Sequence, residues 1–287
     1  MPEDAVRFIQ VGELVKGISE DTLPADDALL GTSLALHAED GAVTRLTFPE
    51  AGRLDWGIID GPGTGEHGQE GCMVTRPRED VVVVDYVAST RRATSVTIIL
   101  DLVRSAATTV VGTLPTAEEA ARSAFELATE GSELTLVAAE FLSATIDRPF
   151  VPGEHPHVPT DELVGKRVQY VYSRTEAYEH IYLNENLYTW QCLRGSEQGL
   201  ADTDRCHYRK IGDELYLFVW REKVIPTLGV VLVDWRLKQS NGKLFGYASS
   251  DFGALSTTAI SSQATLLNVT KHIQGPGAPA RTVAAGS

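Results

Sequence analysis

The chain has 287 residues, of which 43% are hydrophobic, and a formal net charge of −14 at pH 7. This length gives room for two domains of ordinary size. The acidic balance argues against a nucleic-acid partner, because binding to phosphate backbones needs a basic surface. We expect no membrane partner, because no stretch approaches the roughly 20 continuous apolar residues of a membrane helix. The three cysteines do not suggest a disulfide framework, which favours a reduced, cytoplasmic protein.

The two halves of the chain repeat each other at a fixed offset, the 134 residues from Trp56 to Trp190. The same ungapped shift pairs further marker positions: Leu30 with Val164, Gly31 with Gly165, Cys72 with Cys206, and Gly112 with Gly246. This agreement indicates an internal duplication, so we expect two barrels of the same topology. The predicted domains are residues 1–150 and 151–273, followed by a disordered tail over 274–287.

The first copy is predicted to be mainly β. Short runs of β-branched, aliphatic and aromatic residues lie at 34–38, 43–48, 81–86, 96–102 and 109–114. Thr116 and Glu119 have the spacing of a capping box, which predicts one helix from Thr116 to about Ala128 that plugs or flanks the barrel. The segment 134–146 is ambiguous between strand and helix. Four prolines between Arg148 and Pro159 mark the linker between the domains.

The second copy is predicted to form about eight strands, the size at which an antiparallel barrel can enclose one small ligand. They lie at 167–172, 178–183, 187–193, 205–210, 215–221, 229–237, 243–248 and between 257 and 269. Asn241-Gly242 has the composition of a hairpin turn. The predicted fold class is therefore mainly β: two lipocalin-like or calycin-like antiparallel barrels related by duplication, with a short helix between them.

Strand alternation groups aromatic side chains with one carboxylate in the second copy. Residues two apart on a strand share a face, which places Tyr170 with Tyr172, and Phe218 and Trp220 with Glu222. In the first copy, the positions of Tyr170, Tyr172, Trp220 and Glu222 are taken by Leu36, Ala38, Tyr86 and Ala88. The pocket of the first barrel is therefore expected to be degenerate. In an apolar pocket, desolvation would raise the pKa of Glu222, which suits acid–base catalysis. A packed barrel core with Glu222 at a solvated strand end explains the same pattern.

Other side chains of the second copy are candidates for ligand contact: Tyr182, Trp190, Arg194, His207 and Arg209. His180 or His207 could act as a base, although a lone strand histidine is more often structural. No metal site is expected, because Cys206 and His207 point to opposite faces and no paired His or Cys spacing occurs. The run from Gly63 to Gly68 matches the glycine spacing of a dinucleotide-binding motif. That motif must be followed by a helix, but here the sequence after it is typical of a strand, so we expect no nucleotide site.

Several motifs of the second copy resemble the phenolic acid decarboxylases, which are lipocalin-like barrels without a cofactor. They are Gly165-x-x-x-x-Tyr170-x-Tyr172, Tyr178-Glu179, Trp220-x-Glu222 and Lys243-Leu244-Phe245-Gly246. The resemblance implies that Tyr170 and Tyr172 bind a substrate carboxylate and that Glu222 transfers protons. Gln191 stands where that family has a carboxylate-binding arginine, and Arg194 or Arg209 could substitute for it. A different proton-transferring lyase, an isomerase or a hydratase remains open.

A second resemblance spans nearly the whole chain, from Val11 to His272. The chain resembles the molybdenum cofactor biosynthesis protein F (MoaF) family in both copies and in the connecting helix. It also resembles that family in the run Ala201-Asp202-Thr203-Asp204-Arg205-Cys206. This resemblance implies two calycin-like barrels and supplies no settled reaction. We therefore expect a cofactor-independent lyase or isomerase that binds a small aromatic or carboxylated molecule in the second barrel. The alternative is a non-catalytic, lipocalin-like binding or accessory protein, and a homo-oligomer is possible in either case.

Overall fold

The computed structural model describes residues 7–18 and 21–271, so the predicted tail over 274–287 lies outside the described residues. Within these ranges, the first half forms a closed barrel of eight antiparallel strands that pair in chain order. The strands are β1 (Ser33–Ala38), β2 (Val43–Thr47), β3 (Arg53–Asp60), β4 (His67–Arg78), β5 (Val81–Val87), β6 (Thr94–Asp101), β7 (Ala106–Thr113) and β8 (Ala138–Ile146). The ambiguous segment 134–146 therefore ends in a strand.

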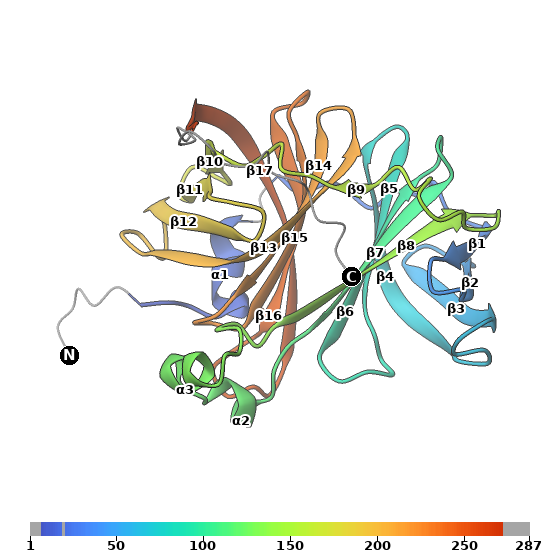
Figure 1. The fold of residues 1–287 in the computed structure, drawn as a ribbon, viewed down its shortest axis with the longest axis horizontal. Helices are drawn as coiled ribbons and strands as arrows, with labels where there is room; N and C mark the ends of the chain where they lie inside the picture. The colour runs from blue at the N-terminus through green and yellow to red at the C-terminus, as the bar shows by residue number, and fades with distance from the viewer. Residues whose placement is uncertain (1–6, 19–20, 272–287) are drawn as a thin grey trace, which may run out of the picture.

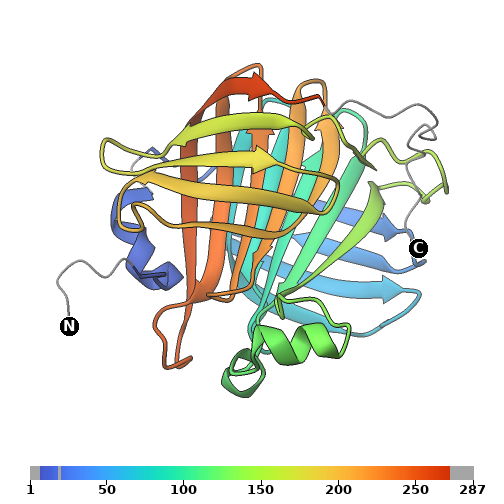
Figure 2. The ribbon, with the colours of Figure 1, turned by 60° about the vertical axis from the view of Figure 1, so that its left-hand side comes forward.

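The second half forms a barrel of the same kind beside the first (Figures 1 and 2), which confirms the predicted fold class. Its strands are β10 (Lys166–Val171), β11 (Ala177–Tyr182), β12 (Leu187–Arg194), β13 (Ala201–Gly212), β14 (Leu215–Glu222), β15 (Thr227–Asp234), β16 (Gln239–Tyr247) and β17 (Leu255–Val269). Pairing of β17 with β10 and of β12 with β13 closes this barrel. A two-residue strand in the predicted linker, β9 (Val158–Pro159), also pairs with β13.

The strand positions of paired residues confirm the internal duplication. Trp56 and Trp190 each lie on the third strand of their barrel, and Gly112 and Gly246 each lie on the seventh. The run from Gly63 to Gly68 falls largely in the loop between β3 and β4, at the same place as the loop between β12 and β13. It is thus part of a hairpin and not the start of a helix.

The turn that precedes the first strand of each barrel is repeated in its hydrogen bonds. The amide of Gly31 donates to the carbonyl oxygen of Phe48 at 2.8 Å, and the amide of Gly165 donates to that of Tyr182 at 2.7 Å. Both glycines have positive φ angles, +72° and +84°. A residue with a Cβ rarely adopts this backbone conformation, which explains why glycine stands at both positions.

The single helix predicted after Thr116 is instead two short helices, α2 (Ala117–Ala120) and α3 (Ala124–Thr129). Thr116 caps α2 as predicted, accepting a hydrogen bond from the amide of Glu119 at 3.1 Å. The chain is interrupted because Ser123 and Glu126 form a second capping box, which begins α3. Both helices lie at one end of the barrels, outside their interiors (Figure 1). None of the helices in the described ranges is long and apolar enough to span a membrane.

Asn241-Gly242 does not form the predicted turn, because both residues lie inside β16. The hairpin turn precedes them, and Lys238 there has a φ angle of +54°. Close strand packing explains the glycine, since a Cβ at Gly242 would lie 2.0 Å from the carbonyl oxygen of Val230 on β15. An Asn-Gly pair is typical of a turn, but here the glycine is needed because β15 and β16 approach each other closely.

An unpredicted N-terminal helix, α1 (Val11–Ile18), packs against β16 and β17 of the second barrel (Figure 2). Val11 is fully buried in the core of that barrel. Gly12 approaches the chain so closely that a Cβ there would lie 2.5 Å from the carbonyl oxygen of Ala248. Residues of α1 therefore complete the core of the second barrel.

The two barrels lie side by side (Figure 1). Outward-facing side chains of β5 to β7 and β14 to β16 pack together between them. These side chains form one apolar cluster with members from both barrels, including Val81, Ile99, Val110, Leu217, Leu232 and Phe245. Ion pairs cross the same contact, joining Arg78 to Asp234 at 2.5 Å and Lys243 to Asp85. The apolar cluster and these ion pairs hold the barrels together as one packed unit.

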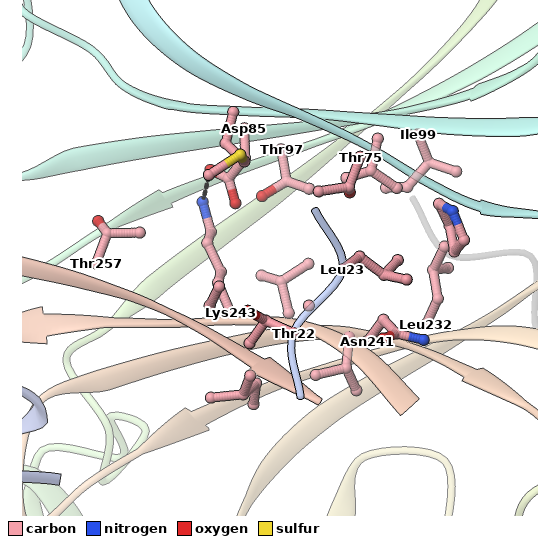
Figure 3. Close-up of a pocket in the computed structure, with 18 of the residues that line it drawn as sticks. Thr22, Leu23, Thr75, Asp85, Thr97, Ile99, Leu232, Asn241, Lys243 and Thr257 are labelled. Carbon is pink, nitrogen blue, oxygen red and sulfur yellow. Dashed lines mark hydrogen bonds and ion pairs between the residues drawn. The ribbon is translucent and has the colours of Figure 1, made fainter. Parts of the chain in front are cut away.

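A cavity of about 260 Å³ lies beside the Lys243–Asp85 pair, between the barrels. Figure 3 shows Lys243 reaching toward Asp85, with Thr22 and Leu23 crossing the cavity between the two walls. The segment that connects α1 to the first barrel therefore runs through the contact between the barrels.

We predict that Lys243→Met lowers the free energy of unfolding by roughly 3–5 kcal/mol, because it leaves the Asp85 carboxylate without its counter-charge. The Lys243 side chain is only 3% exposed and that of Asp85 17%, so the pair is largely withdrawn from bulk solvent. The double variant Lys243→Met/Asp85→Leu should recover most of the loss. Urea unfolding followed by circular dichroism measures both. Equal instability of the single and double variants would contradict the prediction.

We predict that Gly12→Ala loosens α1 from the second barrel, because the added Cβ meets backbone atoms of Ala248 that cannot rotate away. Hydrogen exchange of the amides in α1 should become faster, and the melting temperature should fall. Gly71→Ala on β4 is the matched control, since nothing lies within 4 Å of its Cβ position. Unchanged exchange in α1 would show that the helix tolerates the extra atom.

Candidate functional site

The second barrel encloses a small cavity with an aromatic and acidic lining. It has about 50 Å³ of space for the centres of water molecules. The barrel contributes Tyr172, Tyr178, His180, Tyr188, Trp190, Glu197, Trp220, Glu222, Leu244 and Ile260. Leu14 and Ile18 of α1 complete the lining, so this helix covers the cavity.

Strand β14 supplies the central residues of the site. Phe218, Trp220 and Glu222 point into the barrel, while Leu217 and Val219 join the apolar cluster between the barrels. The predicted common face of the first three residues is therefore observed. Within the cavity, the indole Nε1 of Trp220 donates to Glu222 Oε1 at 2.9 Å, which fixes the carboxyl group against the aromatic wall.

Burial raises the pKa of Glu222 well above its ordinary value, and the nearby carboxyl of Asp204 adds to this shift. The residue as a whole is half-buried, but its carboxyl group faces the aromatic cavity. Burial also raises the pKa of the Tyr172 phenol, and the charge of Glu222 raises it further. The site thus places a carboxyl group with a raised pKa beside a phenol whose pKa is also raised.

His180 is a buried, neutral histidine at the wall of the cavity. Burial lowers its pKa to about 3. The Tyr170 ring lies 4.7 Å from the imidazole ring and the Tyr188 ring lies 5.2 Å from it, measured between centroids. In the described ranges, the imidazole Nδ1 has no hydrogen-bond partner. His180 can therefore bind a ligand as a neutral imidazole.

Glu197 connects the cavity to the segment that precedes α1. One of its carboxylate oxygens accepts from the amide of Ile9 at 3.2 Å, and the other accepts from the phenol of Tyr178 at 3.2 Å. Burial raises the pKa of Glu197. The cavity is consequently lined by two carboxyl groups, and one of them also anchors the chain that covers it.

Asp204 supports the site from behind the wall. It accepts a hydrogen bond from the indole Nε1 of Trp190 at 3.0 Å and another from the amide of Lys223 at 3.1 Å. The Lys223 ammonium group also forms ion pairs with Asp202 and Asp204. Asp204 therefore fixes the orientation of Trp190, and its buried charge contributes to the raised pKa of Glu222.

The predicted site residues fall into three groups. Tyr172, Trp190, Trp220 and Glu222 line the cavity. The others that face the interior lie in the packed core and not in the lining: Tyr170, Tyr182 and Phe218. The hydroxyl groups of Tyr170 and Tyr182 lie 2.5 Å apart and bond to each other. Tyr170 is therefore engaged with Tyr182, while Tyr172 faces the cavity.

Arg194, His207 and Arg209 are not brought to this cavity, which corrects the expectation that they share it. Arg194 is exposed at the end of β12. His207 and Arg209 lie on the outer face of β13, where both contact the Phe141 ring of β8. Strand β13 packs against the barrel core on one face and against Phe141 on the other. The alternation of side chains along the strand therefore shows which residues share a face, but not which face points into the barrel. As a result, no arginine or lysine lines the cavity in the described part of the chain.

Sequence reasoning missed several lining residues. Tyr178 shares a face with Tyr182, and Tyr188 shares one with Trp190, so alternation could have added them. His180, which the sequence offered as a possible base, does line the cavity. Glu197 lies in a loop and gave no such signal. Residues 7–18 and 21–271 contain no group of three or more His, Cys, Asp or Glu side chains arranged to hold a metal ion.

Comparison with known proteins identifies the family. The model of the MoaF N-terminal domain matches residues 6–116, and that of the MoaF C-terminal domain matches residues 157–270. Protein MoaF of Klebsiella aerogenes is 40% identical over 275 residues, which cover 95% of this chain and 99% of that protein. A solved structure described as a putative beta-lactamase from Burkholderia vietnamiensis matches 44% of this chain and 97% of its own, with 15% identity and a TM-score of 0.31. The family models and the relative from Klebsiella together show that the chain belongs to the MoaF family.

Proposed function

We propose that the second barrel binds a small, neutral aromatic molecule and acts on it by cofactor-independent acid–base chemistry, as a lyase or isomerase. The observation that carries this proposal is the Glu222 carboxyl group, which has a raised pKa and lies in an aromatic cavity beside Tyr172. Such a carboxylic acid can donate a proton near neutral pH, as general acid–base catalysis requires. The free thiols of Cys72, Cys192 and Cys206 support a cytoplasmic location.

The groups around Glu222 suit a proton transfer. Once Glu222 has given up its proton, the indole N–H of Trp220 stabilises the carboxylate through the existing hydrogen bond. The phenol of Tyr172 can donate to an oxygen on which negative charge develops. The unpartnered Nδ1 of His180 offers a further hydrogen-bonding position for the ligand. Acid, donor and aromatic wall thus surround one small volume.

The charges of the lining favour a neutral ligand over a carboxylated one. Glu197 and Glu222 face the cavity, and within the described ranges no cationic side chain lines it. A ligand carboxylate would be buried beside these acids without a counter-charge, which is costly. A phenol such as 4-vinylphenol avoids that cost, keeps an aromatic ring for Trp190 and Trp220, and has an alkene carbon that a carboxylic acid can protonate.

A non-catalytic binding protein is the alternative. The cover formed by Leu14 and Ile18 over the cavity favours it, since a carrier gains from holding its ligand away from water. Both functions predict binding of a small aromatic molecule. The enzyme and the carrier differ in whether Glu222 exchanges protons with that molecule.

We predict that the protein exchanges the terminal vinyl hydrogens of 4-vinylphenol for deuterium in D₂O, and that Glu222→Gln slows this exchange by roughly two orders of magnitude or more. Glutamine keeps the shape and the hydrogen bond to Trp220, so binding should change by less than about ten-fold. Proton NMR follows the exchange, and quenching of tryptophan fluorescence follows binding. Glu140→Gln, on an exposed residue, is the charge-matched control. Binding with equal exchange in wild type and Glu222→Gln would favour the carrier.

We predict that His180 makes the protein sensitive to acid. Its pKa is about 3 in the folded protein, against 6.5 for an unperturbed histidine. Between these pH values the unfolded chain binds one more proton, so the stability contributed by neutral His180 is fully present above pH 6.5 and is lost as the pH falls toward 3. The slope approaches about 1.4 kcal/mol per pH unit.

His180→Phe should remove this part of the slope, because phenylalanine fits the aromatic surroundings and does not titrate. Urea unfolding at a series of pH values measures the slope for each protein. His67→Gln is the control, since His67 is exposed at the start of β4. An identical slope in His180→Phe and wild type would contradict a neutral, buried His180.

A further inference from the structure

The first barrel also contains a cavity, and it is larger than that of the second. Its volume is about 160 Å³, against about 50 Å³ in the second barrel. Most of its wall is aliphatic, with Leu36, Leu46, Ile58, Val96, Ile98 and Leu142 among the lining residues. An apolar cavity of this kind suits the hydrocarbon part of a small molecule.

The polar groups of this lining differ in charge from those of the second barrel. Ala88 occupies the position of Glu222, so the carboxyl group of the second site has no counterpart here. Arg91, in the loop between β5 and β6, is the charged residue of the lining. Arg91 is exposed, and it makes no ion pair with any residue of the described ranges. The first cavity therefore offers an unpaired cation where the second offers carboxyl groups.

The remaining polar groups of the wall are mainly hydrogen-bond donors. The Tyr86 phenol lines the cavity and makes no hydrogen bond within the described residues. Its pKa is raised chiefly by burial, while the charge of Arg91, which lines the same cavity, acts in the opposite direction. Glu70 also lies near Tyr86, but it does not line the cavity and accepts hydrogen bonds from the amide and hydroxyl of Ser89.

The duplicated tryptophan shows the same difference between the barrels. In the second barrel, Asp204 accepts the indole hydrogen of Trp190. In the first barrel Glu70 stands at the corresponding position, but it is bonded to Ser89, and the buried Nε1 of Trp56 has no partner in the described residues. The first barrel thus retains donor groups that its own acceptors do not satisfy.

We propose that the first barrel is a second ligand site, which takes an aliphatic monocarboxylate of medium chain length. The hydrocarbon chain would lie among the aliphatic side chains, and the carboxylate would bind Arg91 and the Tyr86 hydroxyl at the loop between β5 and β6. An arginine and a phenol are suitable donors for a carboxylate. The two copies of the duplicated barrel then differ in ligand charge, with an anion in the first and a neutral molecule in the second.

Isothermal titration of the full chain with hexanoate, octanoate and decanoate at pH 7 tests the proposal. We expect one saturable site, with affinity rising about four-fold for each added methylene until the cavity is filled. Arg91→Gln should weaken octanoate binding about 10- to 100-fold, since it removes a charged hydrogen bond. The same variant should leave binding of the neutral probe octan-1-ol nearly unchanged.

Two controls separate this site from others. Arg45→Gln removes the same charge from an exposed position on β2 and should leave octanoate binding unchanged. Glu222→Gln alters only the second barrel and should also leave it unchanged. The proposal is overturned if octanoate shows no saturable binding, if Arg91→Gln and Arg45→Gln bind it equally, or if Glu222→Gln alters its affinity as strongly as Arg91→Gln does.

Discussion

The structure depends on one constraint: several strands must bury both of their faces. In β6 and β15 every residue is buried, and in β14 all but Glu222 are. One face of each strand lines its own barrel, and the other packs into the apolar cluster shared between the barrels. Such strands are apolar along most of their length. The buried carboxylates at the ends of β6 and β15, Asp101 and Asp234, are paired with arginines. The barrel interiors are freer to vary, because the contact between the barrels supplies part of the core.

This constraint explains which parts of the structure could be predicted from the sequence. The repeat, the strands of the second copy and the common face of Phe218, Trp220 and Glu222 follow from spacing and period-two alternation. Alternation could not separate the inside of β13 from its outside, which is why His207 and Arg209 were assigned to the wrong face. The turn expected at Asn241-Gly242 failed because composition does not distinguish a turn from a close approach of strands.

Other parts depend on tertiary contacts that leave no local pattern. The short helix α1 exists because Val11 fills the core of the second barrel and Gly12 fits against Ala248. Glu197 enters the site from a loop. The placement of α1 also means that the two barrels are not independent consecutive segments, since residues of the first half complete the second barrel. The boundary near residue 150 stays a prediction.

Buried charge is handled in two different ways in this protein. At the contact between the barrels, Asp85 faces Lys243, and the pair serves the architecture. In the second barrel, Glu222 has no facing cation among the lining residues, and its pKa rises instead. An uncompensated acid costs stability, so its presence in a duplicated fold whose other copy has Ala88 at that position points to a chemical role.

The path of the chain connects this acid to the rest of the molecule. Leu14 and Ile18 cover the cavity that holds Glu222, while Thr22 and Leu23, a few residues later, cross the contact between the barrels (Figure 3). The same short stretch of chain thus contributes both to the lining of the second site and to the contact between the barrels.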